Sequence, residues 1–132
     1  MKSIKGRVIN GGSVKGQAIV LSMPFSFILN FDPLTGNLKS GYPTAGESLA
    51  GRILVCPGGK GGTVDPYIAY EGKQRGTAPL AILCQTAEPI IALSAITIDI
   101  PMLDSLDADI VNEIKTGDYI ELDGETGTVT IS

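Results

Sequence analysis

Short apolar runs separated by glycine-rich turns dominate the pattern of the chain. Residues 53–56 (ILVC) and 80–84 (LAILC) are wholly apolar and have the length of buried strands. Between them, residues 66–75 predict a short helix that is weakened by Gly72 and ended by Gly76. A strand, a helix and a strand in this order predict one βαβ unit with parallel strands and a right-handed crossover.

Further strands and helices are predicted on both sides of this unit. Residues 5–10 and 16–21 predict an N-terminal hairpin that turns at residues 11–13, and residues 118–122 and 127–131 predict a closing hairpin. Residues 90–95 and 106–115 predict helices, and residues 97–100 predict a third short strand. The fold class expected is therefore mixed α/β in one domain, residues 1–132: a small parallel sheet with helices on one side and antiparallel hairpins on the other.

The three phenylalanines of the chain, Phe25, Phe27 and Phe31, lie close together in the sequence. We interpret their rings as core that packs beneath a loop. Ser26 lies between two of them, and a hydroxyl beside buried rings needs a hydrogen-bond partner. Residues 32–36 predict a turn, and residues 37–50 predict a long surface loop of the kind that often carries function.

A glycine-rich loop follows the first strand of the βαβ unit, with the sequence PGGKGGTV at residues 57–64. Asp65 is predicted to be the N-cap of the following helix, with a proline at the first helical position. Free backbone amides and the positive end of a helix would then meet at one place, which suits a phosphate or carboxylate. The residues expected to bind this anion are Gly59, Lys60, Gly61, Gly62 and Thr63. A tight turn without a ligand is the alternative, because the spacing matches neither a Walker loop nor GxGxxG.

Composition excludes several classes of function. The net charge of −4 and the absence of a basic run argue against nucleic acid as a partner. No apolar stretch reaches the length of a membrane span and the N-terminus lacks a secretory apolar region, so we expect no membrane association and a cytoplasmic location. The chain contains no histidine, which excludes a Ser-His-Asp triad, a Cys-His pair and a phosphohistidine carrier.

Two cysteines, Cys56 and Cys84, both fall in predicted buried strands. We interpret them as reduced core thiols. Two cysteines without histidine are too few for the usual four-ligand zinc or iron–sulfur site, so no metal or cofactor is expected on this chain. Any chemistry must therefore use hydroxyls, carboxylates, lysines, backbone amides or a partner chain.

Several short motifs occur in order along nearly the whole chain. They are Gly6 with residues 16–18 (GQA), residues 25–27 (FSF), 32–36 (DPLTG), 46–52 (GESLAGR), 57–67, 78–79 (AP), 116–118 (TGD) and 123–124 (DG). Taken together, they resemble the aconitase X swivel-domain family, which includes the small subunit of archaeal-type phosphomevalonate dehydratase. The resemblance implies a swivelling β/β/α domain, in agreement with the mixed pattern of strands and helices.

The resemblance also implies a function. In that family a large subunit carries an iron–sulfur (4Fe-4S) cluster, and the heterodimer dehydrates (R)-5-phosphomevalonate to trans-anhydromevalonate 5-phosphate in the modified mevalonate pathway of isoprenoid biosynthesis. The small domain closes over the cluster and contributes its glycine loop. This chain is then expected to be a hydro-lyase (dehydratase) subunit that is active only with its large partner. We expect the face bearing residues 25–27 and 58–63 to contact that partner, since interface cores favour aromatic residues.

One position in the loop departs from the family. A serine in the family's pattern Gly-Arg/Lys-Gly-Ser-Ser/Thr is taken as the proton acceptor, but Gly62 stands at that position here and has no side chain. Thr63 matches the next position and is the candidate substitute, and Ser26 is a more distant candidate. Replacement of Gly62 by serine is expected to be tolerated. The alternatives are a non-catalytic subunit that only closes the site, or a dehydratase of another hydroxy acid.

Overall fold

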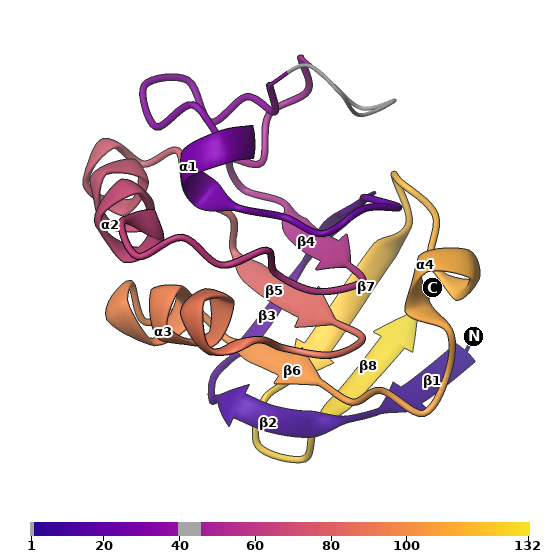
Figure 1. Ribbon diagram of the computed structural model, residues 1–132. Coiled ribbons are helices and arrows are strands. Elements are labelled where there is room, and N and C mark those ends of the chain that lie inside the picture. Colours follow the sequence, from indigo (N-terminus) through magenta and orange to yellow (C-terminus); the bar gives the residue numbers. More distant parts are fainter. Residues whose placement is uncertain (1, 40–45) are drawn as a thin grey trace.

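The computed structural model describes residues 2–39 and 46–132 (Figure 1). Within these residues eight strands form one sheet in the order β1-β8-β7-β3-β4-β5-β6-β2, accompanied by four helices. The strands are β1 (Lys2–Lys5), β2 (Arg7–Asn10), β3 (Ser13–Val20), β4 (Ile53–Cys56), β5 (Ala81–Cys84), β6 (Met102–Asp104), β7 (Tyr119–Asp123) and β8 (Thr128–Ile131). The helices are α1 (Phe27–Asn30), α2 (Asp65–Arg75), α3 (Pro89–Thr97) and α4 (Ile110–Glu113).

The middle of the sheet is parallel and its flanks are antiparallel. β3, β4, β5 and β6 are parallel neighbours, whereas β7 joins β3 and β2 joins β6 in antiparallel fashion. α1, α2 and α3 cover one face of the parallel strands, and α4 with β1, β7 and β8 encloses the other (Figure 1). This mixed α/β arrangement confirms the predicted fold class, and the predicted βαβ unit corresponds to β4, α2 and β5.

Both faces of the parallel strands are buried, so the domain has two apolar layers. The layer beneath α1, α2 and α3 contains the three phenylalanines, which are at most 1% exposed. The ring of Phe27 lies edge-on to both of the others, with centroids 4.9 Å from Phe25 and 5.4 Å from Phe31. The interpretation of these rings as core is therefore confirmed.

The cysteine pair belongs to the same layer. Cys56 of β4 and Cys84 of β5 lie opposite each other in the sheet, with their Sγ atoms 3.4 Å apart, and both are free and fully buried. The hydrogen bond with Cys56, together with burial, raises the pKa of the Cys84 thiol well above its ordinary value. The interpretation of the two residues as reduced core thiols is confirmed.

The predicted N-terminal hairpin is wrong. β2 pairs with β6, and β3 pairs with β7 and β4, so the two segments do not pair with each other. Gly6 interrupts the strand predicted at residues 5–10: Lys5 is the last residue of β1 and Arg7 the first of β2, and these two strands stand at opposite ends of the sheet order. A Cβ atom at Gly6 would lie only 2.7 Å from the carbonyl oxygen of Asp104. The sheet curls until its two edge strands lie end to end at this close approach (Figure 1).

Two boundaries in the second half of the chain also differ from the prediction. The strand expected at residues 97–100 is found at β6, because the amides of Ile98 and Ile100 still bond to carbonyl groups of α3. The helix expected at residues 106–115 is reduced to α4, since the amide of Asp107 bonds to the carbonyl of Lys5 and Asp109 is the N-cap. In both places a long-range or capping hydrogen bond overrides the local pattern.

Three further local predictions are confirmed. β7 and β8 form the closing hairpin, the amide of Gly36 closes the turn at residues 32–36, and Gly76 ends α2 with φ +76°. Of the loop predicted at residues 37–50, residues 40–45 lie outside the described residues. No helix in the described part of the chain combines the length and the apolar character needed to cross a membrane.

Candidate functional site

The glycine loop lies at the edge of the sheet where the parallel strands end, beside the segments that follow β3 and β5 (Figure 1). The amide of Phe25 donates to the carbonyl of Gly58 (2.9 Å), and the amide of Lys60 donates to the carbonyl of Phe25 (3.1 Å). On the other side, a Cβ atom at Gly59 would lie 2.9 Å from Cβ of Ile91 and 2.5 Å from Oε1 of Glu88, so a side chain there would displace α3 or the residue before it. The carboxyl edge of parallel strands is where open α/β sheets bind ligands.

Asp65 organises the residues behind this loop. Its carboxylate is 2% exposed and accepts hydrogen bonds from the hydroxyl of Ser26 (3.0 and 3.1 Å), the amide of Phe27 (3.0 Å) and the amide of Ile28 (3.1 Å). These amides open α1, and Ser26 is the N-cap of that helix. Asp65 therefore caps α1 from the start of another helix, and the expectation that Ser26 needs a partner is confirmed.

The prediction that Asp65 is the N-cap of its own helix is wrong. Asp65 is the first residue of α2, and Val64 precedes it without a side-chain cap. The carboxylate has three donors at the start of α1, whereas Pro66 at the start of α2 has no amide hydrogen to offer. A buried carboxylate must be hydrogen-bonded, and the start of α1 satisfies it better.

Gly62 lies in front of Asp65. It has φ +121°, and a Cβ atom there would lie 2.9 Å from Oδ1 of Asp65 and 3.4 Å from the side chain of Ile28. The structure thus brings Gly62 and Ser26 to the same carboxylate. A serine at position 62 would adopt a backbone conformation that L-residues rarely occupy and would crowd the carboxylate. The geometry therefore opposes the expectation that serine is tolerated at this position.

The outer side of the loop retains unused donors. Among the residues that the structure describes, the amides of Gly61, Gly62 and Thr63 have no protein acceptor. In the same set, the exposed side chains of Lys60 and Thr63 have no hydrogen-bond or ion-pair partner. These three amides, one ammonium group and one hydroxyl are available to an anion, and they belong to four of the five residues expected to bind it; Gly59 is the fifth.

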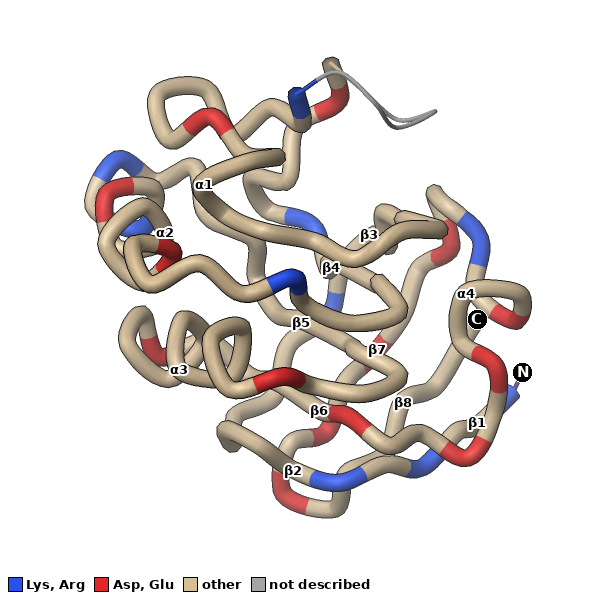
Figure 2. The backbone as a smooth tube through the Cα atoms, viewed as in Figure 1, with Lys and Arg blue, Asp and Glu red and all other residues tan. Residues whose placement is uncertain are grey.

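Other helix starts at this edge are already occupied by carboxylates. Asp65 caps α1, and Glu88 caps α3, where its oxygens accept from the amides of Ile90 (2.9 Å) and Ile91 (2.6 Å). Figure 2 accordingly shows one basic segment on the loop before α2 and one acidic segment at the start of α3. An external anion at this edge would therefore be held by the glycine loop and not by α1 or α3.

A second carboxylate, Asp104, ties the neighbouring strands together. It accepts from Nε (2.8 Å) and Nη2 (2.9 Å) of Arg7 and from the amide of Ala87 (3.1 Å). Burial opposes its ionisation, but these hydrogen bonds outweigh burial and hold the pKa of Asp104 below its ordinary value. Asp104 connects β2 and β6 to the turn before α3, and its role is structural.

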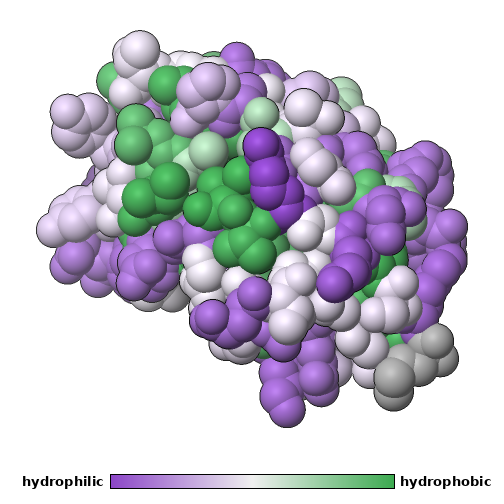
Figure 3. Space-filling view, turned by 90° about the horizontal axis from the view of Figure 1, so that it is seen from below, coloured by the Kyte–Doolittle hydropathy of each residue, from purple (hydrophilic) through white to green (hydrophobic). Residues whose placement is uncertain are grey.

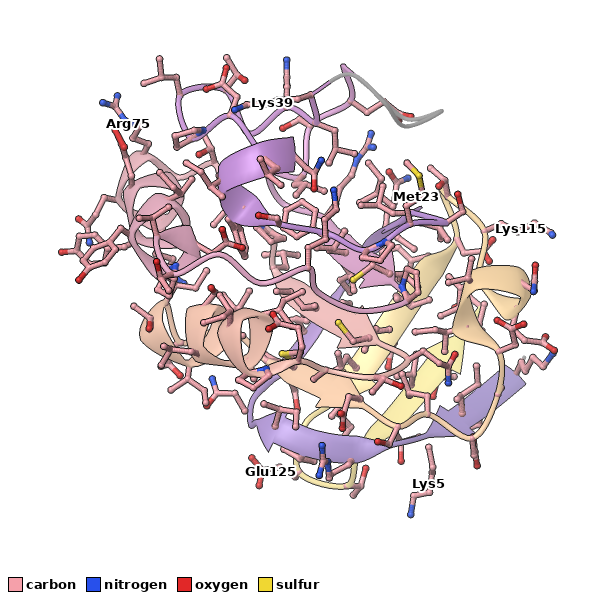
Figure 4. All side chains as sticks on the ribbon, in the orientation of Figure 1. Lys5, Met23, Lys39, Arg75, Lys115 and Glu125 are labelled. Carbon is pink, nitrogen blue, oxygen red and sulfur yellow. The ribbon has the colours of Figure 1, made fainter. Side chains whose placement is uncertain are left out.

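Two exposed side chains lie on the segments that flank α1. Met23 precedes the helix and is 40% exposed, and Lys39 follows it, with Nζ 3.4 Å from the carbonyl oxygen of Ile28 (Figure 4). Within residues 2–39 and 46–132, no group of three or more His, Cys, Asp or Glu side chains is placed to hold a metal ion.

Sequence reasoning missed several residues of this region. It did not join Asp65 to Ser26, although the need of Ser26 for a partner was a usable signal. It placed Glu88 at the start of a helix but did not assign its carboxylate as the cap. The expectation that the face bearing residues 25–27 and 58–63 contacts the large partner stays a prediction; the rings of Phe25 and Phe27 are buried within this chain and do not belong to its exposed surface. The exposed aromatic residues near the loop are tyrosines of α2.

A central parallel sheet with antiparallel flanks, and a glycine loop at the carboxyl edge of its strands, define a swivelling β/β/α domain. The sequence model of the aconitase X swivel domain matches residues 3–131. The chain belongs to this family.

Relatives of known name are similar to this chain over nearly its whole length. It is 43% identical to the phosphomevalonate dehydratase small subunit of Thermococcus kodakarensis, covering 97% of this chain and 95% of that protein. It is 41% identical to the protein of the same name from Methanocella arvoryzae, covering 98% of each. The crystal structure of Thermococcus kodakaraensis aconitase X in its holo-form superposes with a TM-score of 0.94 at 42% identity, covering 100% of this chain and 99% of that one.

Proposed function

We propose that this chain is the small subunit of a two-chain hydro-lyase that dehydrates (R)-5-phosphomevalonate to trans-anhydromevalonate 5-phosphate, a step of isoprenoid biosynthesis. The observation that carries the proposal is the identity of 43% and 41%, over nearly the full length, to proteins named phosphomevalonate dehydratase small subunit. The glycine loop supports it, because its free amides and Lys60 suit the phosphate or carboxylate of such a substrate.

The name small subunit implies a large partner, and we assign the 4Fe-4S cluster to that partner. Cys56 and Cys84 are fully buried and hydrogen-bonded to each other, so this chain does not offer their thiols as ligands for the cluster. In the complex the cluster would supply a Lewis acid for the departing hydroxyl. The part of this chain is then to bind the substrate's anionic groups, to exclude water and to hold or accept the proton.

We assign to the side chain of Thr63 the role of accepting the substrate's proton. Its hydroxyl is exposed on the loop and, among the described residues, free of any partner. The hydroxyl of Ser26 is fully buried and donates to Asp65, so it does not reach a substrate without opening of the fold. Gly62 contributes an amide only. A threonine hydroxyl can act as base only when its pKa is strongly lowered, to which loop amides and Lys60 contribute.

A second candidate is a subunit that closes the site without catalysis. The observation that favours it is Gly62, which leaves the family's serine position without a side chain.

One experiment separates the two candidates. The wild-type chain and its variants are reconstituted with the large subunit, and dehydration of 5-phosphomevalonate is followed at saturating and limiting substrate. Thr63→Val is expected to lower kcat by about 10²–10⁴ with little change in KM, because a base acts in the transition state. Thr130→Val on β8 removes a comparable hydroxyl far from the loop and is expected to keep wild-type kinetics.

Two results would overturn these assignments separately. Unchanged turnover of the Thr63→Val pair, beside an active wild-type pair, would place the base on the large subunit and leave this chain as the closing subunit. A wild-type pair that binds phosphomevalonate without dehydrating it would refute the proposed reaction itself.

A further inference from the structure

α2 and α3 pack side by side over one face of the sheet and present apolar side chains to solvent. We define the α2–α3 face as Tyr67, Tyr70, Leu93 and Ile96, which are 75%, 52%, 49% and 50% exposed. Apolar surface gathers on the side of the molecule that these helices form, at the left of Figure 3. Three of these side chains, Tyr67, Tyr70 and Leu93, line one hollow and therefore share a surface, and Ile96 lies one turn along α3 from Leu93.

A hollow lies within this face. Its volume is about 520 Å³, and it is lined by Thr63, Pro66, Tyr67, Tyr70, Leu93 and Thr97, none of which is charged. The whole of α3 (PIIALSAIT) lacks a charged residue. A helix that is apolar on all sides is normally buried, whereas a helix on a free surface has polar residues on its outer side. The outer side of α3 therefore has the composition of a covered surface.

We propose that the α2–α3 face is the docking surface for the large subunit, an inference that rests on the proposed function for the existence of that partner. Continuity with the glycine loop identifies the occupant. Thr63 belongs to the loop that meets the substrate and also lines the hollow. A large subunit that brings its active site to Thr63 must therefore cover the start of α2 and the adjoining residues.

The composition of the face agrees with this occupant. Interface cores are enriched in tyrosine and depleted of charged residues, and the α2–α3 face contains two tyrosines and two aliphatic residues without a charge. Three charged residues of α2 follow it, Glu71, Lys73 and Arg75, and the first and last of these pair with each other toward the far end of the helix. They are suited to the polar rim of the contact.

Binding of the large subunit tests the proposal without any turnover. The variants are Leu93→Asp and Tyr67→Asp, and the matched control is Tyr119→Asp on β7, an exposed aromatic residue outside the face. Each variant's affinity for the purified large subunit is measured by calorimetry, after circular dichroism has verified its fold. Both face variants are expected to weaken binding more than about tenfold, because a charge in the interface core has no partner. The control is expected to bind as the wild type does.

The outcomes are distinct. Wild-type affinity in both face variants would overturn the proposal, and so would a wild-type chain that does not bind the large subunit at all. If sedimentation shows that this chain self-associates, and the face variants abolish only that association, the face joins two copies and the proposal is wrong. If the wild-type pair binds tightly but does not dehydrate phosphomevalonate, the proposed reaction fails while the docking surface stands. If Leu93→Asp does not fold, the affinity of Tyr67→Asp for the large subunit alone tests the proposal.

Discussion

Replacement of Asp65 is the perturbation that best tests how the site is organised. The carboxylate is buried and has no cation within salt-bridge distance among the described residues, so its direct partners are three hydrogen-bond donors at the start of α1. Asp65→Ala would leave two backbone amides at the start of α1 and the hydroxyl of Ser26 without their acceptor. Asp65→Asn keeps the shape of the side chain but turns an amide group toward at least one of these donors.

The magnitude follows from the donors that lose their partner. Each buried donor left unsatisfied costs about 1–3 kcal/mol, and relief from burying a charge offsets part of that sum. The amide of Ile28 is also only part-buried, so water can replace its partner. We therefore expect Asp65→Ala to reduce the free energy of unfolding by about 2–5 kcal/mol and Asp65→Asn by about 1–2 kcal/mol.

Urea unfolding followed by circular dichroism measures these changes, with an unchanged m-value as the condition for comparing free energies. Asp123→Asn is the control, because its carboxylate also accepts from a backbone amide (2.9 Å) but is exposed in the β7–β8 turn. We expect the control to change stability by less than about 1 kcal/mol. Amide exchange at Phe27 and Ile28 should accelerate in Asp65→Ala. An alanine variant as stable as the control would refute the role assigned to Asp65.

Three further predictions concern packing, backbone conformation and pH. Gly72→Ala is expected to lower the free energy of unfolding in urea by about 1–3 kcal/mol, although helix propensity favours alanine by about 1 kcal/mol. The reason is that the new Cβ would lie 2.8 Å from the buried ring of Phe31. A gain in stability would contradict this prediction. Gly62→Ser is expected to lower the Tm without raising turnover, since φ is +121° and Asp65 lies 2.9 Å from the new Cβ; a variant with wild-type Tm and faster turnover would disprove this. The stability advantage of the wild type over Asp104→Asn should be complete above pH 3.8 and disappear as the pH falls through the lowered pKa of the folded state, whereas a constant difference in Tm down to about pH 2 would contradict the linkage.

Local patterns in the sequence were sufficient for several elements. Wholly apolar runs predicted β4 and β5, because only a strand covered on both faces is apolar at every position. Gly76 ended α2 in a left-handed conformation, and the residues before and after 123–126 formed the closing hairpin. The glycine loop between β4 and α2 was also predicted, from its run of glycines after an apolar strand. These signals depend on neighbouring residues alone, so the sequence contains them directly.

Only the tertiary structure decided which distant segments meet. β3 pairs with β7 and β4 and not with β2, its neighbour in the sequence. The reason is that strand pairing depends on the burial and hydrogen bonds available with every competing strand. Asp65 bonded to Ser26, 39 positions away, because the start of α1 offered more donors than its own helix. The exposure of Tyr67 and Leu93 could likewise not be predicted from the sequence. A periodicity shows which residues share a helix face but not whether another element covers that face.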